Sequence, residues 1–211
     1  MTALTGEIEK WLYLHCPYEA DKAKLVIREM TDLLVLDLVD KGLVTDQMVL
    51  TVGYDIENLT DPARWAKYHG AIEKGPYGRE LPKQAHGSIN LDEHTSSTRK
   101  IMCAVSELFD RIVDKNLLVR RMYVVANHVL PEADAPKKND GVVQLDLFTD
   151  YAAEEEKQKA EDAALERERK IQKTALAIKK KYGKNAILKA MNLEEGATAK
   201  DRNAQIGGHK A

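Results

Sequence analysis

The stretch VRRMYVVANHVL (119–130) reads as a long β-strand. Its apolar residues Met122, Val124, Ala126 and Leu130 share one parity, whereas Arg121, Tyr123 and Asn127 take the other. Successive side chains of a strand point to opposite faces of a sheet. The stretch therefore predicts a strand with one face packed against helices and one polar face left over.

The segments before this strand supply the rest of a small domain. A helix opened by the hydroxyl cap TSST (95–98) carries one apolar stripe, and the strand QAHGSINL (84–91) precedes it. Further upstream, an apolar stripe predicts a helix over 21–41 that Gly42 ends, and MVLTVGY (48–54) predicts another strand. WLYLHC (11–16) can supply a fourth strand. The order β-α-β-β-α-β predicts an α+β sandwich with a four-stranded sheet and two helices on one face.

Alternation also predicts what the uncovered face of this sheet carries. Hydroxyl, imidazole, amide, guanidinium and glycine positions fall on it, namely Thr51, Gly53, His86, Ser88, Asn90, Arg121 and Tyr123. Such groups can donate hydrogen bonds to phosphates without reading bases. The alternative is an ordinary solvated face, which antiparallel sheets commonly have.

The segment TSSTR (95–99) offers a second candidate anion site. Hydroxyls and backbone N–H groups at a helix start attract anions, and Arg99 lies just inside the helix behind Ser97. Simple capping of the helix explains the same residues.

Composition limits the function classes. The 211 residues carry a formal net charge of −2, so DNA binding requires a local basic patch. Two distant cysteines, Cys16 and Cys103, suit reduced thiols better than a metal site. No stretch predicts a membrane span or a signal peptide, so we expect a cytoplasmic protein without a membrane partner.

Changes in composition divide the chain. We expect one domain over 10–131, a Pro/Lys/Asp/Gly-rich linker over 132–150, a charged helix over 151–182 and a tail over 183–211. Within the first domain, glycines and prolines predict a long tyrosine-containing loop from Asp55 to Pro82, a length that is often functional.

The linker contains a short peptide, QLDLF, formed by Gln144, Leu145, Asp146, Leu147 and Phe148. Four of its letters match the QLxLF peptide by which bacterial polymerases and repair proteins hold the sliding clamp. Leu147 and Phe148 can fill an apolar pocket, and the Gln144 amide can satisfy polar groups at its edge. The alternative is a buried strand, VVQLDLF, but the polar flanks favour a peptide that orders on binding.

Together, MVLTVGYD, AHGSINL, TSSTRKI, LVRRMYVVANHVL and QLDLF resemble the little-finger domain and clamp peptide of Y-family (lesion-bypass) DNA polymerases. The ending KKYGKNAILKAMNLEEGATAKDRNAQIGGHKA is similar to that of a bacterial ultraviolet-damage repair branch of the family. The resemblance implies that the domain grips the backbones of duplex primer–template DNA. It implies that Arg120 and Arg121 form a backbone-contacting pair, with His86 and Ser88 on the matching strand of the same face.

The resemblance also limits the expected activity. Catalysis in the family needs palm-domain carboxylates that hold two Mg²⁺ ions, and no such motif occurs in this chain. We therefore expect a fragment of a translesion and DNA-repair polymerase that binds DNA and the beta-subunit clamp, has no catalytic residue and needs no cofactor itself. The alternative is a protein-interaction adaptor that does not bind DNA. An independent small-molecule enzyme would need a nucleophile–base or metal constellation, which the sequence lacks.

Overall fold

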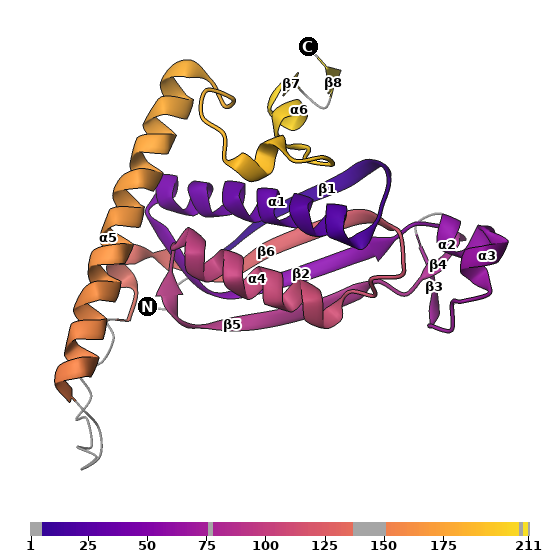
Figure 1. Cartoon of the computed structure of the whole chain (residues 1–211), viewed down its shortest axis with the longest axis horizontal. Coiled ribbons are helices and arrows are strands. Elements are labelled where there is room, and N and C mark those ends of the chain that lie inside the picture. The colour runs from indigo at the N-terminus through magenta and orange to yellow at the C-terminus, as the bar shows by residue number, and fades with distance from the viewer. Residues whose placement is uncertain (1–5, 76–77, 137–150, 207–208, 211) are drawn as a thin grey trace.

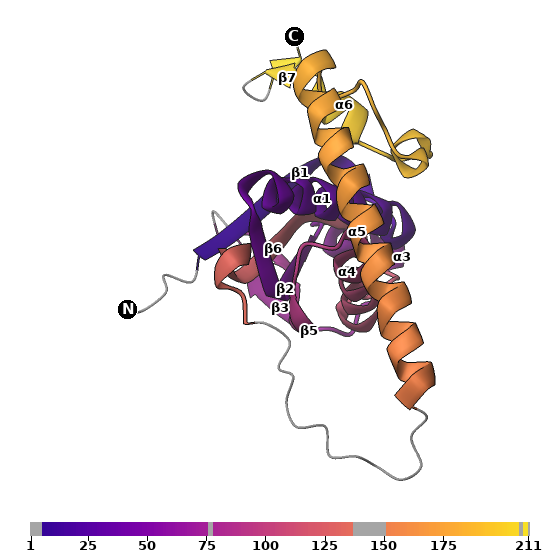
Figure 2. The same cartoon turned by 90° about the vertical axis from the view of Figure 1, so that its left-hand side faces the viewer.

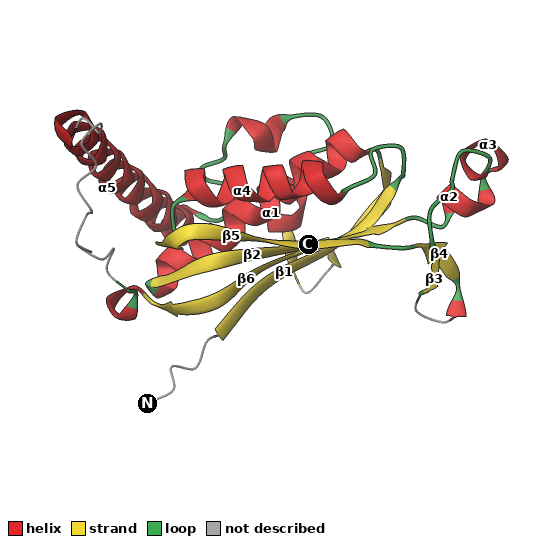
Figure 3. Ribbon diagram, turned by 90° about the horizontal axis from the view of Figure 1, so that it is seen from below, coloured by secondary structure: helices red, strands yellow, loops and turns green. Residues whose placement is uncertain are grey.

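The computed structural model describes residues 6–75, 78–136, 151–206 and 209–210 (Figure 1). Its centre is an antiparallel sheet with strand order β1-β6-β2-β5, formed by β1 (Gly6–Tyr18), β2 (Leu43–Tyr54), β5 (Ala85–Thr95) and β6 (Val119–Pro131). Helices α1 (Ala20–Lys41) and α4 (Thr98–Ile112) both lie on one face of this sheet, as Figure 3 shows from below. The predicted α+β fold and its β-α-β-β-α-β order are confirmed.

The core lies between the two helices and the sheet. Apolar residues of α1 such as Ile27 and Leu34 meet Leu50 and Val52 of β2 there, and all four are fully buried. Gly42 ends α1 in a left-handed conformation (φ 66°), and its N–H reaches the carbonyls of the last turn. The buried apolar positions of α1 and β2 agree with the periodicities of the sequence, and α1 ends at Gly42 as predicted.

Near its end, β6 departs from the predicted alternation. His128 has a left-handed backbone (φ 51°), and the pairing of β6 with β1 shifts register at this point. Val129 is consequently buried in the core at 4% exposure, whereas Leu130 lies outside the core cluster. The prediction that Leu130 continues the apolar parity was wrong because an irregularity flips the strand by one residue.

The segment 55–82, expected to be a loop, contains short elements. These are α2 (Glu57–Thr60), α3 (Pro62–Trp65), β3 (Ile72–Lys74) and β4 (Glu80–Pro82), which project from one end of the sheet (Figure 1). The buried Asn58 fastens this excursion, because its side chain exchanges two hydrogen bonds of 2.9 Å with the backbone of Leu118. Asp61 caps α3 by accepting from Ala63 N.

The long charged helix α5 (Tyr151–Tyr182) crosses the opposite end of the helical layer (Figures 1 and 2). The tail beyond it folds back over α1 as η3 (Ala190–Leu193) and α6 (Ala199–Asn203), and the short hairpin of β7 (Gln205–Ile206) and β8 (His209–Lys210) follows farther from the domain. A short turn, η2 (Glu132–Asp134), follows β6. Because the sheet covers one side of α1 and the tail the other, α1 is buried on more than one stripe.

Candidate nucleic-acid interface

No helix of the described residues covers the face of the sheet opposite α1 and α4 (Figure 3). Register fixes which side chains share it. One row runs across all four strands as Trp11, Tyr123, Thr51 and His86, and the next as Glu9, Val125, Val49 and Ser88. Two flanking rows are Tyr13–Arg121–Gly53 and Asn127–Gln47–Asn90. The structure thus brings Thr51, Gly53, His86, Ser88, Asn90, Arg121 and Tyr123 together on this open face.

Cross-strand hydrogen bonds hold the polar side chains of the open face in place. Thr51 Oγ1 lies 2.8 Å from His86 Nδ1. Gln47 donates from Nε2 to Asn90 Oδ1 at 2.8 Å and accepts from Asn127 Nδ2 at 3.0 Å. These groups remain partly or fully exposed, so they are positioned before any ligand arrives.

Arg121 lies flat on the open face because it faces a glycine. A Cβ on Gly53 would stand 2.3 Å from Arg121 Nε, so the guanidinium stem occupies the space that a side chain would fill. The opposing residue on the other neighbouring strand is Tyr13, which is 59% exposed. Arg121 is therefore directed across the surface and not into the core.

Arg120 joins Arg121 because β6 is irregular between them. The pairing with β2 passes from Gly53–Arg121 to Tyr54–Val119, which leaves Arg120 as an extra residue. Its guanidinium lies 4.8 Å from the centre of the Tyr13 ring, and it donates to His15 O at 3.1 Å. Its Nε is 3.5 Å from Asp55 Oδ2. The two consecutive arginines thus line one hollow of about 330 Å³, together with Tyr13, Asp55 and Arg79.

Charge is distributed unevenly over the open face. The hollow with Arg79, Arg120 and Arg121 lies where the excursion 55–82 leaves the sheet. The exposed carboxylates Glu7 and Glu9 follow β1 away from it. A chain with net charge −2 therefore has a local group of cations at one end of its open face.

Ser97 and Arg99 do not belong to this surface. They lie at the start of α4 beside α5, where Ser97 is buried and Arg99 is exposed: Glu168 accepts from Ser97 Oγ at 2.6 Å and from Arg99 N at 2.9 Å. The Arg99 guanidinium pairs with Glu161 of α5. The anion expected at TSSTR is thus, in this structure, a carboxylate of the chain itself. The side chains of Lys100 and Arg99 lower the pKa of Glu161 below its ordinary value of 4.5.

Three residues of the site were not singled out from the sequence. Trp11 and Tyr13 alternate with the inward-facing Leu12 and Leu14, and that alternation could have placed them on the open face. Arg79 comes from the excursion, for which the sequence offers no comparable signal. The peptide Gln144–Phe148 lies outside the described residues.

Among the described residues, no three or more His, Cys, Asp or Glu side chains are grouped so that they could hold a metal ion. Cys16 and Cys103 are free and exposed. None of the helices described here is both long and apolar enough to cross a membrane.

Comparison with protein families identifies the domain. Residues 15–147 match the model of the impB/mucB/samB family C-terminal domain. The chain belongs to this family, and the matched part is the little-finger domain of Y-family DNA polymerases.

Solved structures give more distant likenesses. The structure described as a complex of beta-clamp processivity factor and little finger domain of PolIV has a TM-score of 0.39 and 8% identity, with 66% of this chain and 100% of that one covered. An insertion ternary complex of Dbh DNA polymerase has a TM-score of 0.36 and 11% identity, with 59% of this chain covered. A post-insertion binary complex of the same polymerase has a TM-score of 0.36 and 12% identity, again with 59% covered. The match spans 29% of each Dbh chain. No curated protein matches the chain.

Proposed function

We propose that this chain is the DNA-binding and clamp-binding C-terminal part of a translesion DNA polymerase, and that it carries no catalytic site of its own. The observation that carries the proposal is the bare sheet face with Arg120 and Arg121 at one end. Family membership supplies the polymerase context. In the intact polymerase, Mg²⁺ would act in the palm domain and not on these residues.

Duplex DNA is the ligand proposed for the open face. Guanidinium, hydroxyl, imidazole and amide donors spaced along four strands suit the phosphates of a double helix and give no means of reading sequence. Thr51, His86, Ser88, Asn90 and Tyr123 provide the neutral contacts. Gly53 keeps Arg121 low against the sheet. Ser97 and Arg99 contribute only if α5 moves off the start of α4, because α5 engages both.

Binding of blunt duplex DNA at several salt concentrations tests this site. We expect Arg121→Ala to weaken binding and to reduce the slope of log affinity against log salt by about 0.9, the value of one phosphate contact. Arg28→Ala is the matched control, because it removes the same charge from α1 on the helix side of the molecule. Equal effects of the two substitutions, or an affinity that ignores salt, would reject the open face as a duplex site.

The sliding clamp is the protein partner proposed for QLDLF. Leu147 and Phe148 supply adjacent large apolar side chains, and Asp146 stands at the position that the motif leaves free. We expect Leu147→Ala/Phe148→Ala to abolish binding of the purified chain to the beta-subunit clamp, whereas Asp146→Ala retains it. Surface plasmon resonance with immobilised clamp measures both. Retention of full affinity by the double variant would refute the assignment of QLDLF as the clamp-binding peptide. A role as a protein-interaction adaptor without DNA would then depend on a surface other than this peptide.

A further inference from the structure

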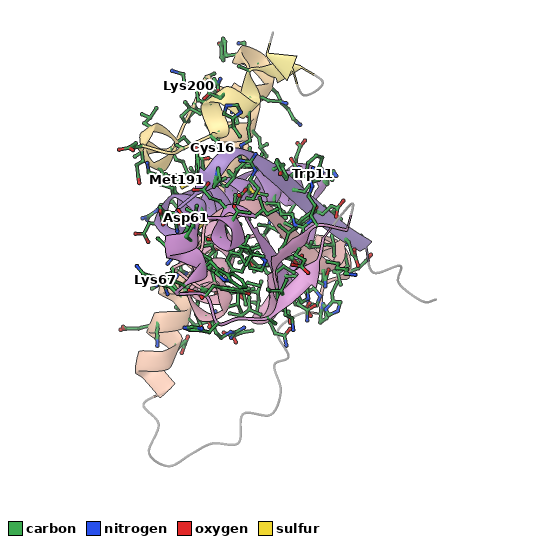
Figure 4. The ribbon with its side chains drawn as sticks, turned by 90° about the vertical axis from the view of Figure 1, so that its right-hand side faces the viewer. Trp11, Cys16, Asp61, Lys67, Met191 and Lys200 are labelled. Atoms are coloured by element: carbon green, nitrogen blue, oxygen red, sulfur yellow. The ribbon has the colours of Figure 1, made fainter. Side chains whose placement is uncertain are left out.

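Two exposed aromatic side chains stand beside the arginine hollow. Trp11 is 66% exposed and Tyr13 is 59% exposed, and both point from β1 to the open face (Figure 4 labels Trp11). Phosphate contacts alone do not require them. Large aromatic rings held in water on a sheet lose the free energy that burial would give, so their place here calls for a partner.

The aromatic rings and the cations form one continuous surface. Tyr123 lies opposite Trp11, and Arg121 lies opposite Tyr13. The Arg120 guanidinium sits 4.8 Å from the centre of the Tyr13 ring, which orients that ring. Arg79 approaches from the excursion side of the same hollow, where Asp55 is the single carboxylate in the lining. Three guanidinium groups against one carboxylate leave a local excess of positive charge.

A surface that combines exposed aromatic rings with arginines suits single-stranded DNA better than duplex DNA. A duplex shows phosphates outward but hides the faces of its bases in the stack. An unpaired strand presents phosphates and base faces together, and aromatic rings beside basic groups bind that combination without sequence preference. The neighbouring Glu7 and Glu9 of β1 repel phosphates at the other end, which confines a strand to the arginine end.

We propose that the surface formed by Trp11, Tyr13, Arg79 and Arg121 binds unpaired single-stranded DNA, with bases stacked on the two β1 rings and phosphates on the arginines. Arg120 positions Tyr13. The inference rests on the proposed function, because it assigns a second form of DNA to the same open face. It adds a site for the unpaired strand that adjoins a primer–template duplex.

Intrinsic fluorescence gives a direct test, because the chain has two tryptophans. Trp65→Phe removes the indole of α3 and leaves Trp11 as the reporter. The full chain with this substitution is titrated at low salt with a twelve-residue thymidine oligomer and, separately, with a blunt twelve-base-pair duplex. We expect the single strand to quench the Trp11 emission by stacking on the indole, and the duplex, whose base faces are hidden, to quench it much less. Equal quenching by both, or quenching by neither, overturns the proposal.

Substitutions separate this inference from the proposed function. Trp11→Ala should weaken single-strand binding about fivefold or more, the effect of one lost stacking contact, and change duplex affinity less than about twofold. Trp65→Ala is the matched control and should change neither. If Trp11→Ala spares the single strand while Arg121→Ala still weakens the duplex, the stacking site is wrong and the duplex face stands. If the chain binds neither form of DNA, both proposals fail.

Discussion

Gly53 and Gly87 occupy neighbouring strands but face opposite sides of the sheet. A side chain on Gly53 would displace the stem of Arg121 on the open face. A side chain on Gly87 would instead stand 3.0 Å from Ile112 Cγ2 and 3.2 Å from Leu108 Cδ1 of α4. Gly53 therefore leaves room for the stem of Arg121 on the open face, and Gly87 lets α4 pack close to the sheet.

These two positions allow a paired prediction. Gly53→Ala should weaken duplex binding about threefold or more, because it lifts a charge-assisted donor off its position, with little change in the free energy of unfolding. Gly87→Ala should lower the free energy of unfolding by about 1–3 kcal/mol through overpacking and leave DNA affinity unchanged. Fluorescence anisotropy and urea unfolding measure the two quantities. The reverse pattern would mean that the faces have been assigned the wrong way round.

Single residues also show which positions on the sheet could be predicted from the sequence. Strict alternation placed Tyr123 and His86 on the open face, because each sits in a regular stretch of strand, and it placed Arg121 there although the pairing of β6 with β2 shifts register directly beside it. The left-handed His128 is not readable from alternation, so Val129 and not Leu130 was the buried residue. Arg79 reaches the hollow through the folding of the excursion, and such long-range approach leaves no local pattern in the sequence.

Among the elements, α5 depends on hydrogen bonds and ion pairs to the start of α4. Gln172 is buried, and its Nε2 donates to Ser96 O and to Thr98 Oγ1, both at 2.9 Å. Glu168 of the same helix also caps the start of α4, because its carboxylate accepts from Ser97 Oγ and from Arg99 N. The charged composition of α5 predicted a helix. Its packing against the start of α4 could not be predicted, because the carboxylate of Glu168 lies 71 residues from Ser97 in the sequence.

Gln172→Ala should loosen α5 from the domain. The substitution leaves buried polar groups at the start of α4 without their donor, which costs about 1–3 kcal/mol. We expect a lower free energy of unfolding and faster amide exchange along α5, with unchanged exchange in β2 and β6. Lys173→Ala, one residue further along, is the control. If α5 exchanges as slowly in the variant as in the wild type, the Gln172 contacts do not hold it.

The same junction should respond to acid. Because Lys100 and Arg99 lower the pKa of Glu161 below 4.5, the folded state binds this proton more weakly than the unfolded state. The resulting stabilisation is present above the unfolded pKa and is lost as pH falls through the lower folded one. Urea unfolding of the wild type and of Glu161→Gln should therefore differ at neutral pH and converge below that value, more weakly in high salt. A difference that persists unchanged in acid would contradict the ion-pair origin.

At the scale of the whole molecule, the excursion that borders the arginine hollow lies at one end of the domain (Figure 1). The arginine hollow adjoins the excursion, whereas η2 and the start of α5, which flank residues 137–150, lie at the other end (Figure 1). The division of the chain at 131, 150 and 182 stays a prediction. The tail after 182 is not separate in space, because it packs on α1.

That packing centres on Glu29, a carboxylate of α1 that is 1% exposed. It accepts hydrogen bonds from Asn192 Nδ2 at 3.0 Å, from Thr198 N at 2.8 Å and Oγ1 at 3.0 Å, and from Ala199 N at 3.0 Å. Arg202, whose pKa burial lowers, pairs with it at 3.4 Å. The tail therefore supplies the donors and the countercharge that make a buried carboxylate tolerable.

Removal of residues 183–211 should consequently destabilise the domain. The truncated chain loses the hydrogen bonds and the ion pair that Glu29 makes with the tail, and a hydrogen bond to a charged group contributes about 1.5–3 kcal/mol. Glu29→Met, which is apolar and of similar length, should lower the free energy of unfolding of the full chain, where it leaves Arg202 and the tail donors without their acceptor, and should change that of the truncated chain much less, because Glu29 is solvated there. Thermal and urea unfolding of the four combinations give the coupling. Additive effects across this cycle would show that the tail and Glu29 act independently and that the tail is only draped on α1.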